Sequence, residues 1–448
     1  MTTNSVLKKI LGVKDTVIDN CTYSEDNRGV GTITTRVHLV KRASCRCPYC
    51  NRKIPKYDRS NKVRTWRALD CGGIIMKIEA ESSRGTCPVH GVVTMAVPWA
   101  YPNSLFTKDF DMTVAWMAKV LSKTAVSQYM RISWATVGRC LSRAMDDLEP
   151  DRKKRLNGLR KIGIDETSYS KGHRYITVVV NHETNTVVWV HKDHGKTVID
   201  EFFKELSEEQ RASLEVVSGD GARWITDAVN EWCPQVDRCT DPFHVVEWAT
   251  EALDSIRKES WQRARAILKE AEKEAGKRHR GRPSSDDKAA EKLRKAREDV
   301  KQIKNSKFAL GKSPEHLTDN QRAKLESIQI NDPILSRAYR LKEKLRIILK
   351  MKDPEAAREE LKHWTMWADR SRIKTFRELS KKIKRHMEYI LNFIRTGISN
   401  ARVEANNNKI SLLVHRSYGF KNYQNMVDLI MLVCSNIKIK LPNRPACI

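Results

Sequence analysis

The chain has 448 residues, which is enough for about three domains with buried cores. No apolar run reaches the ~18 residues of a membrane span, and the N-terminus lacks the basic and apolar segments of a secretory signal. The 83 Lys and Arg residues exceed the 55 Asp and Glu residues, so a net charge of +28 is spread along the chain. This charge indicates a polyanionic partner, most often nucleic acid; a basic surface kept for solubility is the alternative.

The first predicted element is a zinc ribbon near the N-terminus. Cys47 and Cys50 form a Cys-x-x-Cys knuckle, and Cys87 and His90 form a Cys-x-x-His knuckle. Four nitrogen and sulfur ligands of this kind make a closed tetrahedral Zn²⁺ site, which is structural rather than catalytic.

Between the two knuckles, residues 65–80 contain strand-like apolar residues and a Gly72-Gly73 turn. Cys45 is an alternative zinc ligand, and Cys71 is expected to be a spectator. Eleven cysteines in a large chain without a secretory signal favour metal binding over a disulfide framework. Buried thiols without a metal are the alternative.

Residues 105–148 are predicted to form three short helices. An apolar stripe predicts an amphipathic first helix, and a shorter helical segment follows it. Ser133 is a good N-cap for the third helix, whose polar face carries Arg139 and Arg143. The pattern is typical of a helix-turn-helix, in which the last helix enters the major groove of DNA. Three-helix packing without a DNA contact is the alternative.

From residue 161 the pattern changes to strands alternating with helices. The predicted strands are 161–165, 175–180, 186–190, 214–218 and 236–239, and the predicted helices are 196–206, 222–232 and one that begins near 244. The resulting order is three strands, helix, strand, helix, strand, helix. This is the order of an RNase H-like domain, an α/β fold in which helices cover a mixed sheet.

Two aspartates stand at strand ends in this predicted core. Asp165 ends the first strand, and Asp220 lies in a Gly-Asp-Gly turn after the fourth. Adjacent central strands would bring the two carboxylates together, where they could hold Mg²⁺ for phosphodiester chemistry. A single aspartate at a strand end is more often a turn or cap residue, and Asp241 is interpreted in this way.

Residue spacing leaves the third acid open. Glu247 and Glu251 lie on the helix that begins near His244. Glu404 lies on a later, asparagine-rich helix with a polar stripe on one side and apolar residues on the other.

A long, charged helical segment separates the second aspartate from Glu404. Two apolar stripes, at 261–271 and 289–303, predict an antiparallel helical hairpin with a basic tip. The tip contains Arg280 and Arg282 in an Arg-Gly-Arg-Pro sequence that resembles an AT-hook, which inserts arginines into A·T minor grooves. A solvated loop broken by Gly and Pro is the simpler interpretation.

These features together resemble a bacterial insertion-sequence transposase of the DDE type, in the ISL-three family. The resemblance covers nearly the whole length. It is carried by the two knuckles, the three-helix segment, and residues 163–175, 219–225, 241–246, 399–410 and 418–420. The Cys-x-x-His knuckle departs from the family pattern, in which a second cysteine pair is more usual. Histidine is nevertheless a good zinc ligand.

The resemblance implies that Asp165, Asp220 and Glu404 hold Mg²⁺ or Mn²⁺, and it favours Glu404 over Glu247. It also implies that the N-terminal domains bind double-stranded DNA at the terminal inverted repeats of an insertion sequence. Water activated at the acidic site would expose a 3′-hydroxyl, which then attacks target DNA. Trp224 and His244 are predicted to position the DNA.

Five segments are therefore predicted. They are an N-terminal region with the zinc ribbon (1–100), a helix-turn-helix domain (101–155), the first part of the RNase H-like core (156–255), a helical insertion (256–397) and a C-terminal core segment with the third acid (398–448). The expected setting is the bacterial cytoplasm, on the nucleoid and without a membrane partner. A homo-oligomer is expected because two element ends must be joined.

Two rival functions remain. One is a nuclease with the same RNase H-like core but no strand transfer. The other is a zinc-ribbon and helix-turn-helix regulator whose acidic core is inactive.

Overall fold

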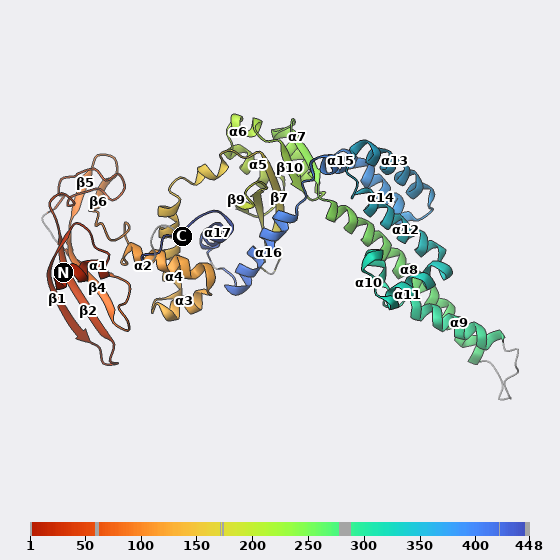
Figure 1. Cartoon of the computed structure of the whole chain (residues 1–448), viewed down its shortest axis with the longest axis horizontal. Helices are drawn as coiled ribbons and strands as arrows, with labels where there is room; N and C mark the ends of the chain where they lie inside the picture. The colour runs from red at the N-terminus through yellow and green to blue at the C-terminus, as the bar shows by residue number, and fades with distance from the viewer. Residues whose placement is uncertain are drawn as a thin grey trace.

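The molecule is elongated and places its predicted parts one after another (Figure 1). A computed structural model describes residues 2–58, 62–170, 172, 174–276, 288–420 and 422–443. A β-rich N-terminal module lies at one end, the three-helix segment and a mixed sheet lie in the middle, and a helical arm forms the other end. Within the described ranges, no helix is long and apolar enough to cross a membrane.

The N-terminal module is a four-stranded sheet with a separate hairpin. Its elements are α1 (Thr3–Ile10), β1 (Thr16–Glu25), β2 (Gly31–Leu39), β3 (Lys62–Arg67), β4 (Ile75–Ser82), β5 (Arg84–Cys87) and β6 (Gly91–Thr94). The sheet order is β1-β2-β4-β3, and β5 pairs with β6. Alternate residues of β4 are buried, and the rings of Trp66 and Trp99 meet edge to face beside them.

The strand-like material predicted within residues 65–80 is confirmed, and the structure divides it between β3 and β4 on either side of the Gly72-Gly73 turn. The β1–β2 hairpin was not predicted. Eight of the ten residues of β1 are exposed, so this strand lacks the alternation of buried and exposed positions that marks a strand in a sequence.

The three predicted helices of the next segment are confirmed as α2 (Lys108–Val120), α3 (Lys123–Tyr129) and α4 (Trp134–Leu148). The side chain of Ser133 accepts a hydrogen bond from the Thr136 N–H at 3.2 Å, so it caps α4 as expected. Thr107 and Ser122 cap α2 and α3 in the same way.

Arg143 has a structural role that differs from the predicted contact with DNA. Its guanidinium donates two hydrogen bonds of 2.8 Å to the carboxylate of Asp111, which is fully buried between α2 and α4. A bidentate buried pair of this kind occupies the donors that a phosphate or base would need. Arg139, by contrast, is exposed on α4, where it donates to Thr136 Oγ1 at 2.9 Å.

A five-stranded mixed sheet forms the centre of the molecule. Its strands are β7 (Lys161–Ser170), β8 (Arg174–Asn181), β9 (Thr186–Lys192), β10 (Val216–Gly219) and β11 (Asp237–Thr240), in the order β11-β10-β7-β8-β9. The strands β7, β8 and β9 are antiparallel neighbours, whereas β10 pairs in parallel with both β7 and β11. All five strands lie where the apolar runs predicted them.

Helices cover both faces of this sheet. On one face, α5 (Lys196–Glu205) and α7 (Arg223–Trp232) pack on β7 and β9, with the short α6 (Glu208–Ala212) between them in sequence. On the other face lie α16 (Ala401–Arg416) and α17 (Tyr423–Cys434), which belong to the C-terminal segment.

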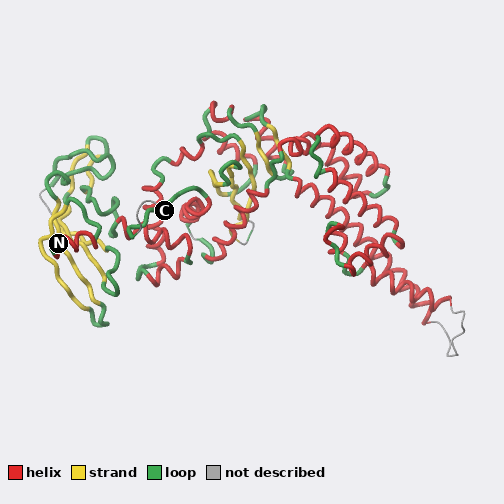
Figure 2. The backbone as a smooth tube through the Cα atoms, in the orientation of Figure 1, coloured by secondary structure: helices red, strands yellow, loops and turns green. Residues whose placement is uncertain are grey.

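Between β11 and α16 the chain forms an arm made almost only of helices (Figure 2). The arm contains α8 (Pro242–Gly276), α9 (Lys288–Ile303), α10 (Lys307–Gly311), α11 (Asp319–Asn331), α12 (Pro333–Ile348), α13 (Pro354–Arg370), α14 (Lys374–Arg385) and α15 (Met387–Thr396). It has its own hydrophobic core, in which Trp364 is 1% exposed and donates to the carbonyl of Leu341 at 2.8 Å. Trp364 is therefore part of the core of the arm.

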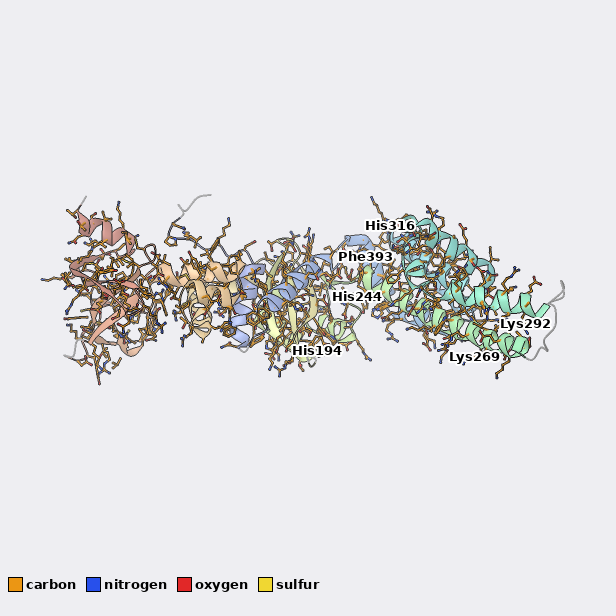
Figure 3. All side chains as sticks on the ribbon, turned by 90° about the horizontal axis from the view of Figure 1, so that it is seen from below. His194, His244, Lys269, Lys292, His316 and Phe393 are labelled. Carbon is orange, nitrogen blue, oxygen red and sulfur yellow. The ribbon has the colours of Figure 1, made fainter. Side chains whose placement is uncertain are left out.

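The far end of the arm is the predicted helical hairpin. Helices α8 and α9 lie side by side, and Lys292 bonds to Glu274 across them at 2.9 Å. Figure 3 shows Lys269 and Lys292 at this end of the molecule. Arg280 and Arg282 lie outside the described residues. The predicted start of the insertion, residue 256, falls inside α8, which begins at the sheet.

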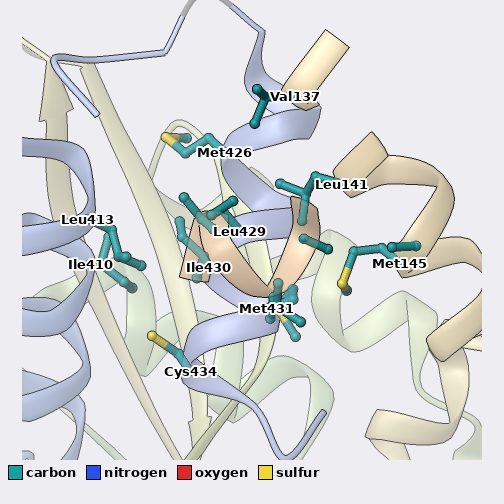
Figure 4. Close-up of a cluster of buried hydrophobic side chains, with 14 of the residues drawn as sticks. Val137, Leu141, Met145, Ile410, Leu413, Met426, Leu429, Ile430, Met431 and Cys434 are labelled. Carbon is teal, nitrogen blue, oxygen red and sulfur yellow. The ribbon is translucent and has the colours of Figure 1, made fainter. Parts of the chain in front are cut away.

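The C-terminal helix α17 joins the three-helix segment to the sheet. Leu429 and Met431 of α17 lie among Val137, Leu141 and Met145 of α4 (Figure 4). A polar contact accompanies this packing, since Ser142 Oγ donates to Asp428 Oδ2 at 2.7 Å. The exposed part of α4 is thus reduced to a narrow stripe that includes Arg139.

The buried pair predicts the effect of Asp111→Ala. The change leaves the Arg143 guanidinium without its acceptor, and the expected loss is about 3–5 kcal/mol of unfolding free energy. Denaturant unfolding of the full chain measures it. The double variant Asp111→Leu with Arg143→Met is the control, because replacing the whole pair by apolar groups should recover most of the loss. Wild-type stability in Asp111→Ala would contradict the structural role of the pair.

Candidate active site and zinc site

Asp165 and Asp220 lie side by side on two adjacent strands. β7 and β10 pair in parallel, with Ser218 opposite Gly163. Continuing this register by two residues places Asp220, which directly follows β10, opposite Asp165 in β7. The expected juxtaposition of the two aspartates therefore follows from the strand register.

The charges of these two carboxylates act on each other. Burial raises the pKa of Asp165 to about 6, and the negative charge of Asp220 acts in the same direction. The backbone N–H of Glu166 donates to Asp165 Oδ1 at 2.9 Å and opposes this rise. Oxygen ligands held close together in this way suit a hard divalent cation such as Mg²⁺.

Helix α16 lies beside the same strands and carries Glu404. One turn before Glu404, the side chain of Asn400 accepts a hydrogen bond from Ser218 Oγ at 2.6 Å and donates to a backbone carbonyl of β7 at 3.4 Å. One turn after it, Asn407 Nδ2 donates to Asp165 Oδ2 at 2.9 Å. Residues three or four positions apart share a helix face, so these contacts turn Glu404 toward the two strands.

A buried hydrogen-bond network supports this docking. His182 Nε2 lies 2.7 Å from Ser218 Oγ, whose hydroxyl proton is donated to Asn400. The neutral His182 ring therefore donates from Nε2, a tautomer assigned from this network. Gly163 leaves the space for this packing, because a Cβ there would lie 2.3 Å from Val403 and 2.7 Å from His182. The sequence placed Gly163 and Ser218 in strands and Asn400 and Val403 on the Glu404 helix, but it did not predict that these residues and His182 meet.

A buried arginine holds the Asp220 turn from behind. Arg238 of β11 is 2% exposed, and its guanidinium donates to the backbone carbonyls of Gly219, Asp220 and Cys239. Burial lowers the pKa of Arg238 to about 10, and the charge of Asp220 opposes this fall. Arg238 was not predicted, although an arginine inside a short apolar strand was an available signal.

His244 lies at the junction of the sheet and the arm (Figure 3). Its Nδ1 is 3.0 Å from Glu247 Oε2, and its charge acts to lower the pKa of Asp165. His244 and Glu247 are therefore both near the acidic cluster. Glu251 is exposed one turn further along α8.

The two other residues considered from the sequence have structural environments. Trp224 is partly buried and packs on the hydrophobic core under α7, and its predicted role in positioning DNA stays a prediction. Asp241 accepts a hydrogen bond from the Phe243 N–H at 3.4 Å, which agrees with its expected turn role at the start of α8. Burial raises the pKa of Asp241, and the charge of Glu404 adds to the rise, so the Glu404 carboxylate lies near it.

The three acids are not gathered as tightly as the zinc ligands. Among the described residues, the one group of three or more metal-ligating side chains whose ligand atoms all lie within 4.8 Å is Cys47, Cys50, Cys87 and His90.

The zinc site has the geometry that the two knuckles predicted. Three edges of the ligand cluster measure 3.6 Å: Cys47 to His90, Cys50 to Cys87, and Cys87 to His90. Sulfur ligands about 2.3 Å from a tetrahedral Zn²⁺ lie about 3.8 Å apart, so the four atoms fit this ion. The surrounding core is small, so the ribbon depends on metal for its stability.

The ligand set predicts how metal content responds to mutation. Wild-type protein should hold one structural Zn²⁺ per chain, and Cys87→Ser should lose it because a closed site needs all four ligands. Metal analysis of purified protein measures this. Cys45→Ser is the matched control, since Cys45 lies outside the cluster and the variant should retain zinc. Loss of zinc from Cys45→Ser would restore Cys45 as an alternative ligand.

Buried His182 predicts a loss of stability in acid. Burial lowers its pKa to about 4, whereas an unfolded histidine titrates near 6.5. Between these values the unfolded chain binds the extra proton, so stability is full above about pH 6.5 and falls by up to about 3 kcal/mol toward pH 4. Denaturant unfolding at pH 7.5 and pH 5 should show that His182→Gln loses less unfolding free energy in acid than wild type does. Buried His386 is present in both proteins, so its contribution cancels from the comparison. Equal losses would contradict the role of His182 in the acid sensitivity.

Three parts of this architecture match models of one protein family. Residues 162–430 match the DDE model of the ISL3 family, described as a transposase. Residues 95–145 match the helix-turn-helix domain of transposase family ISL3, and residues 43–90 match the zinc-finger of transposase IS204/IS1001/IS1096/IS1165. The zinc ribbon, helix-turn-helix and DDE transposase domains expected from the sequence are therefore confirmed.

Two named relatives agree with these matches. The transposase for insertion sequence element IS1557 from two strains of Mycobacterium tuberculosis is 43% identical over 441 residues, which are 98% of this chain and 97% of the relative. The transposase for insertion sequence element IS1001 from Bordetella parapertussis is 26% identical over 305 residues, or 67% of this chain and 66% of that protein. The chain belongs to the ISL3 family of DDE transposases, enzymes that cleave and transfer DNA strands.

Proposed function

We propose that Asp165, Asp220 and Glu404 form the divalent-metal site at which this transposase cleaves and joins DNA. The observation that carries the proposal is the docking of α16. Hydrogen bonds from Asn400 and Asn407 hold it against the β7–β10 pair on both sides of Glu404. Glu247 remains the competing third acid, because it bonds to His244 beside the cluster.

The sheet supports an RNase H-like core. Three antiparallel strands, β9, β8 and β7, are continued by two parallel strands, β10 and β11. Within the proposal, the five segments bounded at residues 100, 155, 255 and 397 are an N-terminal zinc-ribbon region, a helix-turn-helix domain, a first part of the core, a helical insertion and a closing core segment. Because α8 starts at Pro242, the arm begins earlier than the third boundary.

The chain's own groups define what the site does. When bound, Mg²⁺ or Mn²⁺ supplies an activated oxygen nucleophile and stabilises the leaving oxygen. Asp165 and Asp220 offer ligand oxygens fixed by strand register, and the exposed Glu404 approaches from the opposite element. Arg238 holds the Asp220 backbone, and Asn407 orients the Asp165 carboxylate. The products would be a free 3′-hydroxyl at the element end and then a joined target strand.

Recognition of the terminal inverted repeats is assigned to the N-terminal domains. Arg139 stays in this proposal because it lies on the exposed stripe of α4. Arg143 is left out because its guanidinium is bound to the buried carboxylate of Asp111. Arg280 and Arg282 stay as candidates on sequence grounds alone. The enzyme would act on the nucleoid in the bacterial cytoplasm as a homo-oligomer on paired ends, since strand transfer joins two of them.

The site predicts different effects for two neighbouring glutamates. Glu404→Gln should lower Mg²⁺-dependent nicking at the repeat boundary on the order of 1,000-fold, as should Asp165→Asn, because a metal ligand is lost. Glu247→Gln should cost no more than about tenfold, because it removes only a partner of His244. The measurement is cleavage of paired end DNA by zinc-loaded protein.

Binding of the same DNA is the control and should be unchanged in all three variants. Full activity in Glu404→Gln with a large loss in Glu247→Gln would reassign the third ligand. Wild-type protein that nicks but never joins strands would favour the nuclease. Wild-type protein that binds without nicking would favour the regulator.

A further inference from the structure

Helix α14 of the arm packs beside the active site. It contacts α8, whose first residues continue directly from β11 next to the Asp220 turn. On α8, the ring of Trp248 lies against Gly221, where a Cβ would be only 2.3 Å from Trp248 Cζ2. No larger residue fits at Gly221, so an aromatic ring from the arm covers the backbone directly after Asp220.

Lys382 of α14 places a cation on this ring. Its Nζ lies 3.5 Å from the centroid of Trp248, a close cation–π contact. Burial lowers the pKa of Lys382, while the charges of Glu251 and Asp220 act to raise it. Its ammonium group therefore lies within electrostatic reach of the catalytic aspartate.

The ammonium group keeps its hydrogen-bond donors free. Across the described ranges, no carboxylate oxygen lies within the 4.0 Å of an ion pair with Lys382 Nζ, although Glu247 and Glu251 are close enough to act on its pKa. Lys384, two positions along the same helix, is instead bound to Asp369 at 2.7 Å. A lysine ammonium has three donors, and contact with a ring face uses none of them fully.

A row of further cations lies along α14 beside Lys382. The buried face of the helix is largely apolar. The exposed face carries Lys374, Arg377, Lys381 and Arg385, together with Lys384 and one acid, Glu378. The first four lie three or four positions apart, so they form one stripe. In the described part of the chain none of the four forms an ion pair with a carboxylate, so the stripe is available to an anionic partner.

We propose that Lys382 binds a backbone phosphate of the DNA at the cleavage site, and that the α14 stripe carries the same duplex away from the acids. The occupant is DNA because a row of cations three or four residues apart on a helix complements a line of phosphates. Trp248 holds the ammonium group in place beside Asp220 without neutralising it. The proposal rests on the function assigned to the acidic cluster, and it makes the arm part of the active site.

The alternative is that Lys382 only offsets the acids around it and fastens the arm to the core. The two roles differ in their dependence on salt. A residue that binds one phosphate releases about one counterion, so its removal lowers the slope of log affinity against log salt by about 0.9. A purely structural lysine leaves this slope unchanged and lowers only the melting temperature.

The experiment measures binding of a duplex with the element end and its flank, from low to high salt, by full-length zinc-loaded protein. Lys382→Met keeps the length of the side chain and removes its charge. It should weaken binding by about tenfold at low salt, reduce the salt slope by about 1, and raise KM more than it lowers kcat in the nicking assay. Lys382→Arg should restore the slope.

Lys384→Met is the matched control, because it removes a cation of the same helix that is already paired, and it should keep the wild-type slope. The proposal is overturned if Lys382→Met and Lys384→Met have the same slope, or if Lys382→Met only melts earlier. Repeating the binding series in the Asp165→Asn background separates the Lys382 proposal from the proposed function of the acidic site. The salt slope reports on Lys382 even if wild-type protein never nicks DNA. A failure of wild-type protein to nick would contradict the proposed function and not the Lys382 contact.

Discussion

The attachment of α16 to the two central strands is the contact on which the proposed catalytic arrangement depends. Register alone aligns Asp165 with Asp220, but the proposed third acid, Glu404, arrives from a segment distant in sequence. Asn400 and Asn407 fix it at two points, one on β10 and one on the Asp165 carboxylate. Closing so long a loop would be entropically costly for a flexible chain. The arm reduces this cost because it folds around its own core and returns its end to the sheet.

The same C-terminal segment also sets the relation between DNA recognition and catalysis. Helix α17 packs on the sheet and on α4, so the three-helix segment shares a hydrophobic core with the catalytic strands. A flexible linker would leave their relative orientation free, whereas a shared core determines it. The buried pair of Arg143 and Asp111 joins α4 to α2 within the three-helix segment, so it occupies an arginine that could have contacted DNA.

The sequence predicted the parts whose signals are local. Strand runs, the Ser133 cap and the two zinc knuckles depend on neighbouring residues, and each was found in its expected place. The site was predictable only in part. Asp165 and Asp220 followed from strand order, whereas Glu404 could not be separated from Glu247 by spacing, because that choice depends on how a remote helix docks.

The supporting residues were harder to foresee for the same reason. Ser218, His182 and Arg238 owe their roles to contacts between elements far apart in the chain. Of the three, only Arg238 has an unusual local pattern, an arginine inside a short apolar strand. The environment of Arg143 could not be predicted, because a basic residue on a polar helix face gives the same sequence pattern whether it contacts DNA or a buried carboxylate. The β1–β2 hairpin left no alternation because most of β1 faces solvent.

The late position of Glu404 in the chain has a consequence during synthesis. The zinc ribbon, the three helices and both aspartates leave the ribosome well before α16 does. Under the proposed assignment of Glu404, a growing or prematurely terminated chain holds the N-terminal domains but lacks one metal ligand and the α17 surface that packs on α4. Such a product would bind an element end without cutting it. The proposed assignment thus ties DNA cleavage to the synthesis of the C-terminal segment.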